Sequence, residues 1–319
     1  PANYDNLIKI QSIFLKCYFD TPETPTMFQK LIEDKDYNFS RYNFFLTNHL
    51  IYKNKIEAAK NIVKESQKLN NSNLLLNHTE YLVLNKKIKK IKNFYNCKNP
   101  EDNIAEIFYI IANMYSSEQN YKLSNFYLKI SFLLNSSFIP NKALLAENLF
   151  FQKKYEKAEK SFNLLKSIGP IYSWYASTSI AQIYTKTQNE KKATLFLQKE
   201  LDLLKNPNFK QYYEIANFYK KNKYFKESIK YYSLALNDID QSHSLYPKIL
   251  EKRGTSYERL DNWDLAEKDL LQSLVILPDQ PFVLNYLAYS WIEKRINLNK
   301  AMGMLKKAVK LKNNNGYII

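Results

Sequence analysis

The chain has 319 residues, of which 45% are hydrophobic and 24% charged, so it can bury a core and is not disordered by composition. Its four glycines lie far apart, which excludes a glycine-rich phosphate loop and a dinucleotide-binding fingerprint and disfavours an all-β sandwich. The formal net charge of +16 would attract anionic partners, although an AT-rich genome gives the same bias without any basic binding surface.

The cysteines and the first residue bear on the compartment of the protein. Cys17 and Cys97 are the only two cysteines and form no CxxC pair, so we expect two free thiols, with neither a disulfide scaffold nor a cysteine zinc site. Free cysteines fit the cytoplasm and do not forbid the periplasm. Because the chain begins at Pro1 and not at Met, we expect that an upstream segment, such as a targeting segment, is missing. No stretch reaches the roughly 18–20 apolar residues of a membrane span.

Three helix pairs of irregular pattern are expected in the N-terminal third, residues 1–104. Their apolar residues follow a helical period, and the breaks between them are polar or contain proline. The expected pairs are 4–19 with 26–36, joined by a turn at 21–25, then 42–69, and a shortened pair at 74–95.

From residue 105 onward, a fixed order of small and large residues recurs. A small residue is followed three positions later by a large one, and then by a second apolar stripe that opens in several units with an aromatic residue. The small residues recur at intervals of 34 to 38 residues and are Ala112, Ala146, Ala181, Ala216, Gly254 and Ala288. We expect them to let paired helices approach closely, with Tyr121, Tyr155, Phe225 and Trp263 at the starts of the second helices.

This pattern resembles the tetratricopeptide repeat family, in the style of its bacterial members. The resemblance implies an all-α fold, a right-handed α-solenoid of stacked antiparallel helix pairs in which each pair contacts only its neighbours. We expect about nine pairs: atypical ones in 1–104, a regular array in 105–312, and the start of a truncated further repeat in 313–319. The array lacks a polar capping helix, so we expect the chain to continue or its C-terminal end to associate with another chain.

The sequence shows no pattern typical of catalysis. His49, His78 and His243 are isolated, and none has a second ligand at the spacing of a known zinc motif, so we expect no metal and no cofactor. No nucleophile motif occurs, and we expect no catalytic residues and no enzyme activity. The run of lysines within residues 86–92 is interpreted as a solvated helix face, which makes nucleic acid an unlikely partner.

The resemblance implies that the first helix of each pair lines a concave groove that binds peptides or partner proteins. Aromatic, amide and lysine side chains on these helices suit such a groove, because tyrosine buries a large area and lysine meets carboxylates. Asn217 with Lys248 and Lys252 partly resembles a clamp for a peptide carboxylate, with Tyr213 in place of a further lysine. The predicted binding residues are Tyr175, Gln182, Tyr213, Asn217, Lys248, Lys252, Asn285, Tyr286 and Tyr289.

A non-enzymatic scaffold that binds a protein or peptide partner in this groove is therefore the expected function. Two alternatives stay open. They are a basic surface protein that binds RNA, acidic lipid or acidic protein, and the helper region of a larger protein. The localisation also stays open between a bacterial cytoplasm and the periplasm or envelope.

Overall fold

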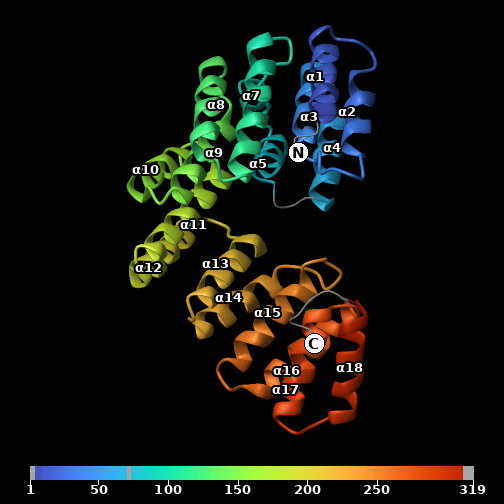
Figure 1. Ribbon diagram of the computed structural model, residues 1–319, viewed down its shortest axis with the longest axis vertical. Coiled ribbons are helices and arrows are strands. Elements are labelled where there is room, and N and C mark those ends of the chain that lie inside the picture. The colour runs from blue at the N-terminus through green and yellow to red at the C-terminus, as the bar shows by residue number, and fades with distance from the viewer. Residues whose placement is uncertain (1–3, 70–72, 312–319) are drawn as a thin grey trace. The chain divides into compact units, whose positions relative to one another are not determined.

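The computed structural model describes residues 4–69 and 73–311, and every regular element in these ranges is an α-helix (Figure 1). The all-α class and the antiparallel helix pairs are confirmed. The chain divides into two compact units, residues 1–187 and 188–319. The division into atypical pairs in 1–104 and a regular array in 105–312 stays a prediction, and the expected further repeat at 313–319 lies outside the described residues.

The helices of the first unit pair in chain order, apart from its last one. They are α1 (Tyr4–Tyr18), α2 (Thr24–Ile32), α3 (Tyr42–Tyr52), α4 (Ile56–Leu69), α5 (Leu74–Leu84), α6 (Ile88–Lys92), α7 (Pro100–Ser117), α8 (Tyr121–Leu134), α9 (Ile139–Phe151), α10 (Tyr155–Leu165) and α11 (Pro170–Lys186). Those of the second unit are α12 (Glu190–Asp202), α13 (Phe209–Lys221), α14 (Phe225–Asn237), α15 (Tyr246–Glu258), α16 (Trp263–Ile276), α17 (Pro281–Glu293) and α18 (Leu298–Leu311).

The helix starts follow the predicted anchors closely. Tyr121, Tyr155, Phe225 and Trp263 are each the first residue of a second helix, as expected. Prolines occupy the first turn of α7, α9, α11, α15 and α17, where the missing N–H costs no helical hydrogen bond. The expected second helix at 26–36 is displaced, because α2 already begins at Thr24 and takes Pro25 into its first turn.

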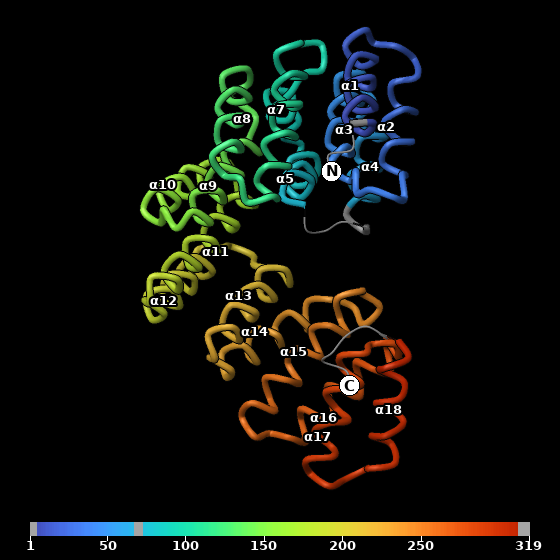
Figure 2. The backbone as a smooth tube through the Cα atoms, viewed as in Figure 1, coloured from blue at the N-terminus to red at the C-terminus, as the bar shows by residue number. Residues whose placement is uncertain are grey.

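Short turns join the two helices of each pair within each unit (Figure 2), and one backbone geometry recurs in these turns. The turn contains a non-glycine residue with a left-handed backbone, for example Asn54, Lys153 and Lys223 with φ of 59°, 59° and 65°. The N–H of the next residue then bonds the carbonyl five positions earlier, as from Lys154 to the Leu149 oxygen at 2.9 Å. This bond satisfies a carbonyl at the helix end and offsets the cost of the left-handed residue.

Small residues sit where paired helices meet. The six predicted small anchors are all buried. Gly254 of α15 shows the reason most directly, because an added Cβ would lie 3.1 Å from the Ala266 carbonyl oxygen and 3.2 Å from the Leu270 Cγ of α16. The close approach of α15 and α16 therefore depends on the absence of a side chain at residue 254.

The first unit departs from a simple solenoid. Helix α5 packs against α11, and α1 packs against α7, so helices far apart in the sequence share contacts. Helices α1 to α6 also share one core rich in aromatic rings, with Phe14, Phe45 and Tyr95 in mutual contact. The expectation that each pair contacts only its neighbours is therefore wrong for this unit.

A buried ion pair joins α7 to the start of α3. The Arg41 guanidinium, in the residue before α3, donates to both carboxylate oxygens of Glu106, at 3.0 and 2.6 Å. It also lies 4.2 Å from the centre of the Tyr109 ring, which adds a cation–π contact. Burial lowers the pKa of Arg41, but the Glu106 carboxylate helps to raise it above its usual value, so Arg41 stays charged. Burial raises the pKa of Glu106, and the Arg41 charge opposes that rise.

Candidate partner-binding face

In the first unit, polar side chains link the first helices of successive pairs. Ser116 of α7 donates to the Asn148 amide oxygen of α9 at 2.6 Å, and the Tyr175 hydroxyl of α11 donates to the Glu147 carboxylate of α9. Burial raises the pKa of Tyr175, and the Glu147 carboxylate reinforces the shift. The Tyr175 hydroxyl therefore remains a hydrogen-bond donor at all ordinary pH values and links α11 to α9.

The second unit repeats this arrangement with a lysine. The Lys220 ammonium of α13 donates to the Thr255 hydroxyl and, at 3.2 Å, to the Lys252 carbonyl oxygen, both on α15. The Tyr286 hydroxyl of α17 then donates to the Glu258 carboxylate of α15 at 2.7 Å. The first helices α13, α15 and α17 are thus joined by one row of polar contacts, which we call the α13–α15–α17 face.

Lys220 is the most perturbed cation on this face. Burial lowers the pKa of its ammonium to about 8, and the nearby positive charge of Lys252 adds to the shift, while Glu251 opposes it. An anion that approached this ammonium would raise its pKa again. Lys220 is not among the predicted binding residues, because its burial depends on the packing of α13 against α15.

The predicted residues in the second unit differ in how much of each side chain is available. The Asn217 amide oxygen accepts a hydrogen bond from the buried Tyr232 hydroxyl at 2.8 Å, and Asn217 also bonds Tyr213. Lys248 is exposed, and Lys252 and Asn285 are half-buried. Tyr289 is 42% exposed. The amide of the predicted clamp is therefore already held within its own helix pair, whereas its two lysines have accessible side chains.

The remaining predicted residues, Tyr175 and Gln182, lie on α11 in the first unit. Gln182 is exposed, while Tyr175 is half-buried. The structure does not relate them to the residues of the second unit, so the nine predicted residues are not shown to form one site.

An apolar groove beside the second helices α8 and α10 was not predicted. It has a volume of about 420 Å³ and lies among α8, α9 and α10. Its lining includes the strongly exposed Leu133 and Leu164, with 83% and 71% of their surface accessible, and the lysines Lys129 and Lys142. The irregular apolar residues on these helices carry no repeat signal, which is why the pattern search passed over them.

The lysine run at 86–92 is largely solvated, as predicted. Its exposed lysines are Lys86, Lys87, Lys89 and Lys90. Ile91 is fully buried, and the Lys87 ammonium donates to the Tyr81 hydroxyl at 2.7 Å. The Lys92 ammonium lies 5.1 Å from the centre of the Tyr52 ring. At least two of these lysines therefore lie over tyrosines of neighbouring helices.

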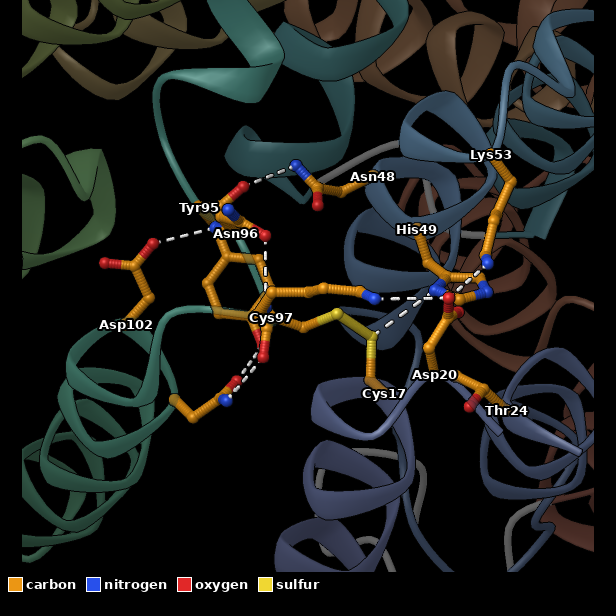
Figure 3. Close-up of a disulfide and its surroundings, with 12 residues drawn as sticks. Cys17, Asp20, Thr24, Asn48, His49, Lys53, Tyr95, Asn96, Cys97 and Asp102 are labelled. Atoms are coloured by element: carbon orange, nitrogen blue, oxygen red, sulfur yellow. Dashed lines mark hydrogen bonds and ion pairs between the residues drawn. A yellow bond between two sulfur atoms is a disulfide. The ribbon is translucent and has the colours of Figure 1, made fainter. Parts of the chain in front are cut away.

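The expectation of two free thiols is wrong. Cys17, near the end of α1, forms a disulfide with Cys97 in the segment between α6 and α7, across 80 residues of sequence (Figure 3). His49 of α3 lies beside it, with its Nδ1 atom 3.4 Å from the Cys17 sulfur. The pairing depends on the departure of the first unit from a simple solenoid, which no local spacing reveals. A buried disulfide favours an oxidising compartment.

Two of the three histidines are also buried, which the sequence did not distinguish. Burial lowers the pKa of His49. His78 of α5 lies among the Tyr81, Phe94 and Tyr172 rings, and neither of its ring nitrogens has a hydrogen-bond partner. Burial lowers the pKa of His78 to about 4, with a smaller contribution from Lys90.

No helix in the described ranges is both long and apolar enough to cross a membrane. No family model matches the sequence, and no curated protein matches it either.

Several solved structures resemble the chain. A chain of the Cut9–Hcn1 hetero-tetramer of the APC/C aligns with a TM-score of 0.49 at 14% identity, over 99% of this chain and 62% of that one. The present chain thus spans less than two thirds of that protein's length. MamA (residue 41 to its end) from Desulfovibrio magneticus RS-1 aligns with a TM-score of 0.43 at 11% identity, over 55% of this chain and 95% of that one. YrrB, described as a TPR protein with an unusual peptide-binding site, aligns with a TM-score of 0.36 at 17% identity, over 59% and 92% of the two chains.

These similarities are too distant to carry function, and the fold assignment rests on the chain itself. Small anchors are buried between paired helices, aromatic residues open α8, α10, α14 and α16, and one left-handed turn closes the pairs. The helix pairs of this chain therefore have the fold of the tetratricopeptide repeat family.

Proposed function

We propose that the chain is a non-enzymatic scaffold that binds a segment of a partner protein on the α13–α15–α17 face. The observation that carries the proposal is the set of cations gathered there. The half-buried Lys220 ammonium adjoins α15, on which Lys252 is half-buried and Lys248, one helical turn away, is exposed. An acidic side chain or a terminal carboxylate is the natural complement of this cluster.

The tyrosines supply the apolar part of the same surface. Tyr213 and Tyr286 are half-buried and Tyr289 is exposed, so their rings can cover a peptide while their positions are fixed by the helices. The Tyr286 hydroxyl is held by Glu258, which orients its ring before any partner arrives. Such pre-organisation lowers the entropy lost on binding.

Short fluorescein-labelled peptides of one apolar sequence, carrying glutamate, glutamine or lysine at alternate positions, test the proposal. Fluorescence anisotropy with the full chain is expected to show tighter binding of the glutamate peptide than of the other two. The double substitution Lys248→Met and Lys252→Met is expected to weaken binding of the glutamate peptide about 10-fold or more, which corresponds to about 1.4 kcal/mol. Binding of the glutamine peptide is expected to stay unchanged.

The substitution pair Lys306→Met and Lys310→Met on α18 is the matched control. It removes the same charge from two exposed lysines with the same spacing of four residues. Equal losses in both double variants would mean that overall charge, and not this face, attracts the peptide, and an absence of binding by all three peptides would refute the scaffold function.

The basic-surface alternative gives a different result in the same assay. An RNA oligonucleotide or a vesicle of anionic phospholipid would then bind more tightly than any peptide. Its affinity would fall steeply, about 1000-fold or more for six to ten phosphate contacts, between 50 and 200 mM salt. Partner-segment binding through a few charges is expected to show a much smaller salt dependence.

A further inference from the structure

Three side chains that suit a soft metal ion meet inside the first unit. Cys17 comes from α1, His49 from α3, and Cys97 from the segment between α6 and α7 (Figure 3). Their ligand atoms, the two sulfurs and a ring nitrogen, all lie within 4.8 Å of one another. The three residues are buried, with 1%, 5% and 5% of their surface exposed. They are the only such cluster of His, Cys, Asp and Glu ligands among the described residues.

The distances are close to those that a tetrahedral zinc ion requires. Zinc–sulfur bonds of about 2.3 Å and a zinc–nitrogen bond of about 2.0 Å place two sulfurs about 3.8 Å apart and a sulfur and a nitrogen about 3.5 Å apart. The Cys17 sulfur and His49 Nδ1 are already separated by 3.4 Å. Only the two sulfurs, joined at 2.04 Å by the disulfide, have to separate.

The segment that carries Cys97 is held in place independently of the disulfide. Asn48 of α3 donates to the Tyr95 carbonyl oxygen at 2.8 Å, and Asn103 of α7 donates to the Cys97 carbonyl oxygen at 2.8 Å. The Asp102 carboxylate accepts the Asn96 N–H at 2.7 Å. Because these contacts fix the backbone on both sides of the sulfur, Cys97 is expected to stay near Cys17 and His49 after reduction.

We propose that Cys17, His49 and Cys97 bind one zinc ion when the disulfide is reduced. The metal ion and the disulfide are then alternative cross-links between α1 and the segment before α7. A dithiol reductant supplies two electrons and two protons, which convert the protein disulfide to two thiols while the reductant becomes a disulfide. Zinc then binds both sulfurs as thiolates and releases the two protons to solvent. A water molecule completes the coordination, as in zinc sites with three protein ligands.

The charge balance favours zinc at this buried position. Two thiolates neutralise the dication and the imidazole is neutral, so the complex adds no net charge to the core. The nearby ammonium groups of Lys53 and Lys98 both contact the Asp20 carboxylate, at 2.5 and 3.2 Å, which offsets part of their repulsion of the metal. A lone dication without the thiolates would meet net positive surroundings, so the oxidised chain is expected not to bind zinc.

The test uses the full chain, reduced with dithiothreitol and freed of reductant and metal under anaerobic conditions. Titration with Co²⁺ is expected to give the thiolate charge-transfer and ligand-field absorption of a tetrahedral site, saturating at one ion per chain and displaced by Zn²⁺. The oxidised chain is expected to give neither band. His49→Gln is expected to lower Co²⁺ affinity about 10-fold or more, since even the mutation of a residue that only hydrogen-bonds to a metal ligand lowers affinity this much. His243→Gln, in the other unit, is the matched control and is expected to bind like the unsubstituted chain.

Three results would overturn the proposal. They are an absence of thiolate–cobalt absorption in the reduced chain, equal metal binding by the oxidised chain, and unchanged affinity in the His49→Gln variant. Circular dichroism covers the case in which reduction unfolds part of the chain. Recovery of helix content with one equivalent of Zn²⁺ supports the site, and failure to recover counts against it as firmly as missing absorption.

Discussion

The disulfide between Cys17 and Cys97 is expected to contribute a large share of the stability of the first unit. It closes a loop across a sequence separation of 80 residues. In the chain-entropy treatment, a loop of this length removes about 15 cal/mol/K from the unfolded chain, or about 4.5 kcal/mol at 25 °C. Since whole domains are stable by only about 5–15 kcal/mol, its loss would leave the first unit close to unfolding.

Amide hydrogen exchange of the full chain measures this effect separately in the two units. We expect the double substitution Cys17→Ala and Cys97→Ala to lower the free energy of opening by about 4 kcal/mol in helices α1, α3 and α7. Helices α15 to α18 belong to the other unit and are expected to be unchanged. The unsubstituted chain, reduced and free of metal, is the control, because it loses the cross-link and keeps both sulfurs.

A fall of less than about 1 kcal/mol in the double variant would refute this reasoning. It would mean that contacts within the unfolded chain already bring the two cysteines together, or that the aromatic core holds α1 without the cross-link. An equal fall in both units would instead show that the two units unfold together.

Two further buried groups give predictions for the same unit. Because the pKa of His78 is lowered from 6.5 to about 4, its neutral form stabilises the fold fully above about pH 6.5, and this stability is lost as the pH falls toward 4. Between pH 7.5 and 5 we expect the free energy of unfolding to fall by about 2 kcal/mol more in the unsubstituted chain than in His78→Gln, as measured by urea unfolding, and equal slopes would contradict the assignment. Glu106→Gln leaves the buried Arg41 without its counter-charge and is expected to cost about 3–5 kcal/mol in the same measurement. Glu118→Gln, at an exposed position after the same helix, is the control and is expected to change stability by less than about 0.5 kcal/mol.

The repeat was predictable because equivalent positions carry similar side chains in several successive repeats. Tyr155 and Trp263 each open a second helix, and Ala146 and Gly254 each allow a close helix contact, so the signal adds over successive repeats. The left-handed turn recurs just as regularly but escaped the pattern search. Its positions carry residues such as Lys153 and Asp261 and not glycine, because a backbone hydrogen bond and not the residue type stabilises the turn.

The disulfide was not predictable, because it depends on contacts that occur once. Cys17 and Cys97 meet where α1 packs back against α7, beside a core of unrepeated aromatic residues. A search for a repeating pattern detects residues that recur in all repeats and misses residues that occur in only one. The same reason explains why the burial of His49 and His78 went unnoticed.

The candidate site shows a related limit, since the sequence predicted which residues line the groove but not what their polar groups already bind. The Tyr286 hydroxyl is committed to Glu258, and the Asn217 amide oxygen to Tyr232. Replacing either residue with alanine would lower both the stability of the scaffold and its affinity for a partner. A loss of binding would then not show which of the two effects caused it. At Lys252 the backbone carbonyl, and not the side chain, accepts the bond from Lys220. Substitution there keeps the link between α13 and α15 and removes only a charge, which is why the lysines, and not the more numerous tyrosines, provide the decisive test of partner binding.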